Sequence, residues 1–226
     1  MKPIVIFGIG KISEVMHYFF ENHSEREIKA FTIDDEFLNS ETKYQKPVVK
    51  FSQLENLYPP SEFDVFIALG YQRMNKVRED IYKRVEKKGY KLISFIHPES
   101  GIPKDCKVGK NCMIMNNVNI HPKVIIGNNV FVWSGSVIGH HSKIEDNCWL
   151  TSSSNISGNV KIGRNCFFAI NSTVTHSVTI GKECFIGANV LISKCTKDLE
   201  VYIFERTKPF RLNSKQFIRM TNFDII

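Results

Sequence analysis

A large apolar side chain recurs every six residues through the second half of the chain. Sixteen successive positions at this spacing are apolar: Ile102, Val108, Ile114, Ile120, Ile126, Val132, Ile138, Ile144, Leu150, Ile156, Ile162, Phe168, Val174, Ile180, Ile186 and Ile192. With 42% hydrophobic residues, chance produces such a run only about once in a million sequences. The position four residues later is small or β-branched throughout. Glycine follows the apolar residue at 109, 127, 139, 163, 181 and 187, where a side chain would obstruct the turn.

A period of six fits neither an α-helix nor a heptad coiled coil. It indicates short β-segments that each direct one large and one small side chain inward, with turns between them. Three such segments close a triangular coil of 18 residues, and stacked coils share parallel-strand hydrogen bonds about 4.8 Å apart. The sequence therefore predicts a parallel β-helix from about residue 100 to residue 197.

The first 96 residues alternate between β and α patterns instead. We expect strands over residues 3–7, 28–33, 47–51, 64–69 and 90–96, and helices over residues 11–22, 52–57 and 75–88. Ser52 is expected to cap the second helix in a capping box with Glu55. This alternation predicts a small parallel sheet covered by helices, a Rossmann-like α/β domain. The expected organisation is an α/β domain over 1–96, a β-helix over 97–200 and a basic tail over 201–226.

Composition excludes several classes of protein. The 226 residues carry a net charge of +7 and no apolar run long enough to span a membrane, and no signal peptide is evident, so we expect a cytoplasmic globular protein. The six cysteines include no Cys-x-x-Cys pair, and five of them occupy the small inward position of the repeat. Only Cys195 is out of register. Structural cysteines are therefore expected, and no metal site.

A glycine-rich turn follows the first expected strand. Residues 8–13 (GIGKIS) form an incomplete dinucleotide fingerprint, with serine at the third glycine position. The turn is either a phosphate or nucleotide site at a helix N-terminus or simply a tight turn. Asp34 and Asp35 would contact a ribose or base, or lie in a solvated turn. The residues expected to bind substrate in this domain are Gly8, Gly10, Lys11, Asp34, Asp35, Gly70 and Tyr71.

The combination of a small βαβ domain and a six-residue β-helix resembles the NeuD and PglD-like bacterial sugar acyltransferases. The most specific stretches are residues 137–144 (VIGHHSKI) and 156–163 (ISGNVKIG). The resemblance implies a left-handed helix, a homotrimer, and transfer from acetyl-CoA to an amine or hydroxyl of a sugar. It also implies that the sugar is often nucleotide-linked and held by the N-terminal domain.

The same resemblance assigns candidate catalytic residues. His140 matches the family's general base, and His141 stands where PglD-like enzymes often have glutamate. Trp149 replaces a second histidine and Trp133 a polar pocket residue, which implies an acceptor different from the family's best-known amino sugars.

The repeat supports His140 independently. Steps of 18 residues from His140 reach Gly158 and His176, so these positions should stack on one face. The Gly158 N–H would then lie where it can bind a thioester oxyanion. Neutral His140 would accept the proton of the sugar nucleophile and pass it to the thiolate. The alternatives are an exposed surface histidine for His140 and trimer packing for His141. His121 and His176 are expected to be surface or interface residues.

A CoA groove should be basic because the cofactor carries phosphates. Its expected residues are Lys161, Arg164, Ile170, Lys182, Gly187 and Lys208. The tail, with five cations against Glu205 between 205 and 219, either covers the 3′-phosphate or is a solvated charge run. No recurring basic–aromatic motif points to nucleic acid. A zinc hydrolase of the γ-carbonic-anhydrase type needs a third convergent histidine that the repeat does not place.

The sequence therefore favours an acetyl-CoA-dependent acetyltransferase that acts on a sugar in bacterial surface glycan synthesis. The competing interpretation is a non-catalytic, nucleotide-sugar-binding trimer that has the same fold.

Overall fold

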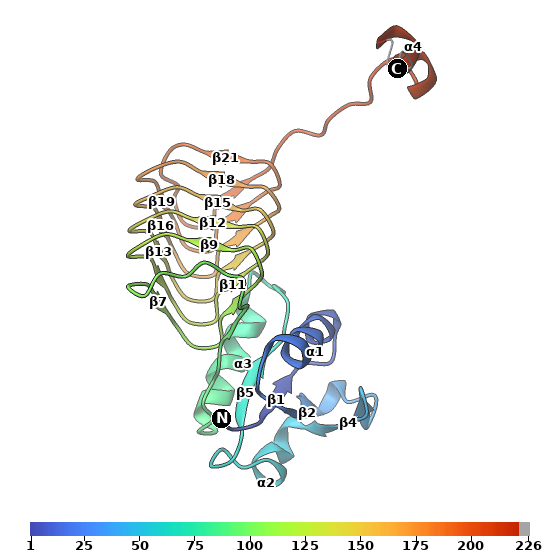
Figure 1. The fold of residues 1–226 in the computed structure, drawn as a ribbon, viewed down its shortest axis with the longest axis vertical. Coiled ribbons are helices and arrows are strands. Elements are labelled where there is room, and N and C mark those ends of the chain that lie inside the picture. Colours follow the sequence, from blue (N-terminus) through green and yellow to red (C-terminus); the bar gives the residue numbers. More distant parts are fainter. Residues whose placement is uncertain (222–226) are drawn as a thin grey trace.

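The computed structural model describes residues 1–221, which form an α/β unit, a tall β-helix and a C-terminal tail (Figure 1). The α/β unit contains β1 (Ile4–Phe7), α1 (Lys11–His23), β2 (Ile28–Ile33), β3 (Thr42–Lys43), β4 (Lys46–Lys50), α2 (Leu54–Leu57), β5 (Asp64–Ile67) and α3 (Lys76–Lys87). Its sheet has the order β3-β4-β2-β1-β5, and all neighbours are parallel except the β3–β4 hairpin. The predicted α/β class is confirmed.

The strand order places a crevice at one defined point of this sheet. From β1 the chain builds outward through β2 and β4, and it then crosses back to add β5 on the other side of β1. The loops after β1 and β5 therefore diverge at the carboxyl edge, where open α/β sheets bind ligands.

Two details of the predicted α/β unit were wrong. Ser52 does not cap α2, because residues Phe51–Gln53 form a 3-10 turn and Gln53 precedes the helix without a side-chain cap. The Ser52 hydroxyl instead donates to Asp35. The strand expected over 90–96 is reduced to β6 (Phe95–Ile96), which pairs with β8 (Met113–Ile114) of the β-helix.

The β-helix is built from two-residue strands. They are β7 (Lys107–Val108), β8, β9 (Asn119–Ile120), β10 (Ile125–Ile126), β11 (Phe131–Val132), β12 (Val137–Ile138), β13 (Lys143–Ile144), β14 (Trp149–Leu150), β15 (Asn155–Ile156), β16 (Lys161–Ile162), β17 (Phe167–Phe168), β18 (Thr173–Val174), β19 (Thr179–Ile180), β20 (Phe185–Ile186), β21 (Leu191–Ile192) and β22 (Val201–Tyr202). From β7 to β21 every third strand pairs in parallel at a step of 18 residues, as Ile138 with Ile156, whereas β22 pairs with β20 at a step of 16. The predicted parallel β-helix and its coil length are confirmed.

Three sheets form the faces of this prism. We call them the aromatic face (β6, β8, β11, β14, β17, β20, β22), the histidine face (β9, β12, β15, β18, β21) and the lysine face (β7, β10, β13, β16, β19). The second residue of each strand points inward, and nearly all are buried in one core with the small residues of the corners. Cys112, Cys148, Cys166 and Cys184 belong to these small residues, whereas Cys195 is exposed.

The corners depend on two residue types. Asparagine recurs at left-handed corner positions, with φ of 51–63° at Asn111, Asn129, Asn147 and Asn165, because its short polar side chain tolerates this conformation. Gly139 is required for another reason. A Cβ there would collide with the backbone of Ser157 and Gly158 in the next coil. The corners therefore bring successive coils into backbone contact.

The aromatic face is covered by the α/β unit. Its outward residues Met113, Phe131, Trp149 and Phe167 are at most 6% exposed and join the core of that unit. Asn75 at the start of α3 donates to the Cys166 carbonyl at 3.3 Å. Within residues 1–221, the other two faces have no such cover.

The tail leaves the last coil after β22 and ends in α4 (Ser214–Thr221), remote from the body (Figure 1). Residues 203–211 are exposed along this segment. No helix within residues 1–221 is both long and apolar enough to cross a membrane.

Candidate active site

His140 lies at the corner that follows β12, with its ring against the next coil. A Cβ built on Gly158 would lie 2.6 Å from His140 Nε2 and 2.7 Å from Cε1. The imidazole therefore occupies space that only glycine leaves free. The Gly158 N–H makes no hydrogen bond with the described residues, so it is available to a ligand beside the ring. The structure brings His140 and Gly158 together as the 18-residue step predicted.

His141 occupies the left-handed position of the same corner, at φ 59°. Its Nδ1 lies 3.1 Å from His140 Nδ1, and the two rings are nearly perpendicular. One Nδ1 must carry the proton. If His140 donates, its Nε2 is left as the free base, and His141 holds that tautomer. A carboxylate accepting at this place would have the same effect.

Of the two further histidines near this corner, His121 lines a hollow beside His140, and His176 lies close to the His140 ring. A pocket of about 240 Å³ is lined by His121, Val137, Gly139, His140, Asn155, Ile156, Ser157 and Gly158. The His176 ring lies 6.0 Å from that of His140 and is tilted by 52°. Both His140 and His141 are exposed in the single chain.

The lysine face carries the basic residues expected for CoA. Arg164 and Lys182 line a hollow of about 450 Å³ with Lys143, and Lys161 and Lys182 line an adjoining one of about 390 Å³. Lys161, Arg164 and Lys182 are thus neighbours. Lys143, which the sequence analysis did not select, belongs to both hollows, and its signal was the step of 18 to Lys161.

The remaining CoA candidates lie elsewhere in the chain. Ile170 and Gly187 follow strands of the aromatic face, at the corner toward the histidine face, and Ile170 is 55% exposed. Lys208 lies on the segment that leaves the β-helix. One chain does not bring these three residues to the lysine face.

The loops after β1 and β5 line the crevice at the carboxyl edge. Gly10, Lys11, Gly70 and Tyr71 all border this hollow of about 450 Å³. Gly8 lies beneath it at φ 120°, and a Cβ there would be 2.7 Å from the Ala68 carbonyl oxygen. Four of the residues predicted to bind substrate therefore meet at the switch point of the sheet.

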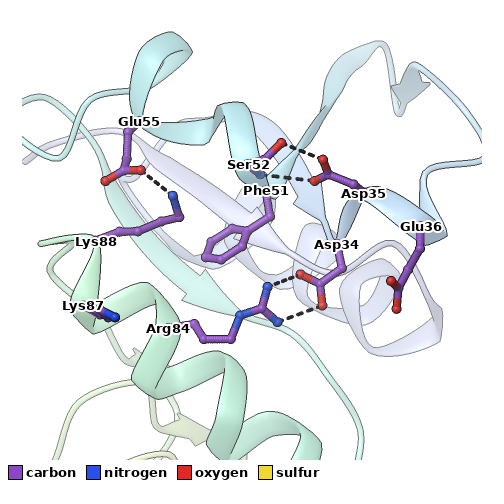
Figure 2. A pocket seen from close by; sticks show the side chains of 9 residues that line it. All are labelled: Asp34, Asp35, Glu36, Phe51, Ser52, Glu55, Arg84, Lys87 and Lys88. Atoms are coloured by element: carbon purple, nitrogen blue, oxygen red, sulfur yellow. Dashed lines mark hydrogen bonds and ion pairs between the residues drawn. The ribbon is translucent and has the colours of Figure 1, made fainter.

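Asp34 and Asp35 border a different hollow, of about 710 Å³, between α2, α3 and the end of β2 (Figure 2). Arg84 donates to both carboxylate oxygens of Asp34, at 2.5 and 3.0 Å. Ser52 donates its hydroxyl and N–H to Asp35, which lowers the pKa of this carboxyl. Both carboxylates thus have protein partners, and the structure does not bring them to the Gly10–Gly70 crevice.

Trp149 is not a surface pocket residue. It is 2% exposed and packs against Tyr71, Phe131 and Trp133 at ring distances of 5.2–5.8 Å. The physical reason is its outward position on the aromatic face, which the α/β unit covers. Trp133 is half-buried in the same cluster, and the indole nitrogens of both lack hydrogen-bond partners among the described residues. Trp149 therefore supports Tyr71, which is itself 51% exposed at the crevice.

Comparisons with known proteins show the same fold. The bacterial transferase hexapeptide family (six repeats) matches residues 105–140 and 161–194. A variant of perosamine N-acetyltransferase from Caulobacter crescentus, in complex with CoA and GDP-perosamine, is 22% identical with a TM-score of 0.82, covering 90% of this chain and 94% of its own. The acetyltransferase domain of PglB from Neisseria gonorrhoeae is 19% identical with a TM-score of 0.80, over 93% and 100% of the two chains. WeeI from Acinetobacter baumannii is 19% identical with a TM-score of 0.75, over 90% and 97%. The predicted left-handed β-helix behind an α/β domain is thereby confirmed.

Proposed function

We propose that this chain, whose residues 105–140 and 161–194 belong to the bacterial transferase hexapeptide family, is an acetyl-CoA-dependent sugar acetyltransferase. The observation that carries the proposal is the His140 ring, placed against Gly158 with its Nδ1 beside His141. The fold shared with perosamine N-acetyltransferase, which holds CoA and GDP-perosamine, supports it. The acceptor is a nucleotide-linked sugar of bacterial surface glycan synthesis, and the reaction takes place in the cytoplasm.

The chemistry follows from the atoms of this corner. His140 Nε2 accepts the proton of the sugar amine or hydroxyl as that nitrogen or oxygen bonds to the thioester carbonyl carbon. The Gly158 N–H donates to the oxygen that becomes negative. The carbon–sulfur bond then breaks, and the proton on Nε2 passes to the leaving thiolate. No acyl-enzyme forms, and His140 returns to its neutral form.

A homotrimer is part of the proposal because one chain separates the parts of the site. The Gly10–Gly70 crevice borders the aromatic face through Tyr71, whereas His140 follows a strand of the histidine face. The CoA candidates likewise divide between the lysine face and the corner that carries Ile170. In a trimer of prisms, the crevice and Ile170 of one protomer would face the histidine corner of its neighbour. CoA phosphates would lie along Lys161, Arg164 and Lys182.

The direct test measures thiol release from acetyl-CoA with a panel of amino-sugar and deoxy-sugar nucleotides. His140→Ala should keep its secondary structure and oligomeric mass and lose about 10²–10⁴-fold in turnover, the contribution of a positioned base. His23→Ala, which removes an exposed histidine at the end of α1, should have no effect. Near wild-type turnover by His140→Ala would contradict the assignment. If the wild type releases no thiol with any member of the panel and binds no CoA in calorimetry, the non-catalytic trimer is favoured.

A further inference from the structure

Arg78, in the first turns of α3, is a completely buried arginine at the junction between the α/β unit and the β-helix. Its Nε donates to Asn129 Oδ1 at 3.1 Å, and Nη1 donates to the Gly70 carbonyl at 3.1 Å. Nη2 donates to the carbonyls of Asn129 and Asn147, both at 3.2 Å. The guanidinium thus ties the crevice loop to two corners of the β-helix.

None of these partners carries a charge. The ion pairs found among residues 1–221 do not include Arg78. The nearest rings are those of Phe131 and Trp149, at 4.4 and 5.2 Å from Cζ. Burial lowers the pKa of the guanidinium to about 9, so it stays protonated at neutral pH. A buried cation is costly unless a counter-charge compensates it, and within the described residues that counter-charge is missing.

The Gly70 peptide shows where a counter-charge fits. The chain has no cis peptide bond among its described residues, and in a trans peptide the C=O and the following N–H point in opposite directions. The Gly70 carbonyl points inward to Arg78, so the Tyr71 N–H points away from it. Gly70 and Tyr71 line the crevice, and this N–H makes no hydrogen bond with the described residues. Arg78 polarises this peptide group from behind.

We propose that Arg78 is a positioning residue for the diphosphate of the acceptor. It holds the Gly70–Tyr71 peptide so that the Tyr71 N–H donates to a phosphate oxygen, and the phosphate supplies the counter-charge that the junction lacks. The inference rests on the proposed nucleotide-linked acceptor. Lys11 borders the same crevice from the α1 side, so the phosphates would lie between the two loops.

Two substitutions test the charge in different ways. Arg78→Met removes it while keeping an unbranched apolar stem. Asn129→Asp keeps the arginine. It replaces the amide whose Oδ1 accepts a hydrogen bond from Arg78 Nε, at 3.1 Å, with a carboxylate. Calorimetry would compare the binding of GDP, UDP and dTDP with that of the corresponding nucleosides. We expect both variants to lose about tenfold in affinity for the diphosphate that the wild type binds, the worth of one polarised hydrogen bond. Nucleoside affinity should not change.

Two controls match these substitutions. Lys76→Met removes the ion pair with Glu183 across the same junction, and it should leave diphosphate affinity unchanged. Asn129→Asp also breaks the Asn129–Asn147 side-chain bond. Asn171→Asp breaks the equivalent bond to Asn189 at a corner without an arginine, and it should likewise have no effect.

The outcomes separate the two proposals. A folded Arg78→Met or Asn129→Asp protein with wild-type diphosphate affinity would overturn the role of Arg78, and so would equal losses for diphosphate and nucleoside. If Arg78→Met does not fold, Asn129→Asp decides. A wild type that binds no nucleoside diphosphate would overturn the proposed acceptor class, and with it this inference.

Discussion

Gly158→Ala tests the geometry of the proposed site with a single methyl group. The new Cβ would lie 2.6 Å from His140 Nε2, 2.7 Å from Cε1 and 3.1 Å from Cδ2, whereas ordinary contact begins at 3.4 Å. The ring must therefore move by about 3.4 − 2.6 = 0.8 Å to restore ordinary contact. The three nearest atoms all belong to this side chain, so we expect the ring to move and the coil to keep its position.

A displacement of this size acts on the reaction and not on the fold. Misplacing a reacting group by about 1 Å costs on the order of 10²-fold in rate. We therefore expect turnover in the thiol-release assay to fall about 10²-fold, with the melting temperature unchanged. The oxyanion donor is retained, because alanine keeps the N–H. Gly163→Ala is the matched contrast. Its Cβ would lie 2.8 Å from backbone atoms of Gly181 and Lys182, so it should lower the melting temperature instead.

Two results would refute this reasoning. One is a folded Gly158→Ala protein with wild-type turnover. The other comes from a double-mutant cycle with His140→Ala. If the methyl acts through the ring, adding Gly158→Ala to His140→Ala should cause little further loss. A second, fully additive loss would mean that the methyl disturbs something other than His140.

Three further predictions concern ionisable side chains. Ser52→Ala should raise the pKa of Asp35, followed by carboxyl NMR, because it removes the hydroxyl hydrogen bond that contributes most to holding that pKa low and keeps only the backbone one. The hydroxyl bond stabilises the fold above the unfolded-state pKa and less as pH falls. Burial, then His23, lowers the pKa of His97. As pH falls, the unfolded chain therefore binds the proton before the folded chain does. The free energy of unfolding measured in urea titrations should then decrease below a pH of about 6.5, and this decrease should be smaller in His97→Gln. Cys195 is exposed, whereas burial raises the pKa of Cys112 to about 11. A thiol reagent should therefore label Cys195 first, and Cys195→Ser should remove the fast phase of the labelling reaction.

The β-helix could be predicted from sequence because its rule is local and repeated. Each coil buries one large and one small side chain per strand, so Ile138 and Ile156 have equivalent surroundings one coil apart. The same step correctly placed Gly158 against His140. The asparagines at 111, 129, 147 and 165 recur at this same step of 18 and mark one set of corners, a signal that the sequence analysis did not use.

The docking of the α/β unit was not predicted because its contacts join residues distant in sequence. Arg78 and Asn129 meet only when α3 lies on a corner of the prism. One signal was nevertheless present. The residue before the inward position is Met113, Phe131, Trp149, Phe167 and Phe185 at steps of 18, an apolar stripe on one outer face. Such a stripe indicates a covered face, and it would have shown Trp149 to be buried.

The coverage of that face also constrains how the proposed enzyme encloses its reaction. The α/β unit lies on the aromatic face, so the histidine corner of the same chain stays open and His140 is exposed. An exposed imidazole and a free Gly158 N–H are surrounded by water, which weakens every electrostatic contribution to the transition state. In the proposed trimer, a neighbouring protomer would bring both its crevice and its own apolar surface to that corner. Turnover should therefore depend on assembly even though His140, His141 and Gly158 all belong to one chain.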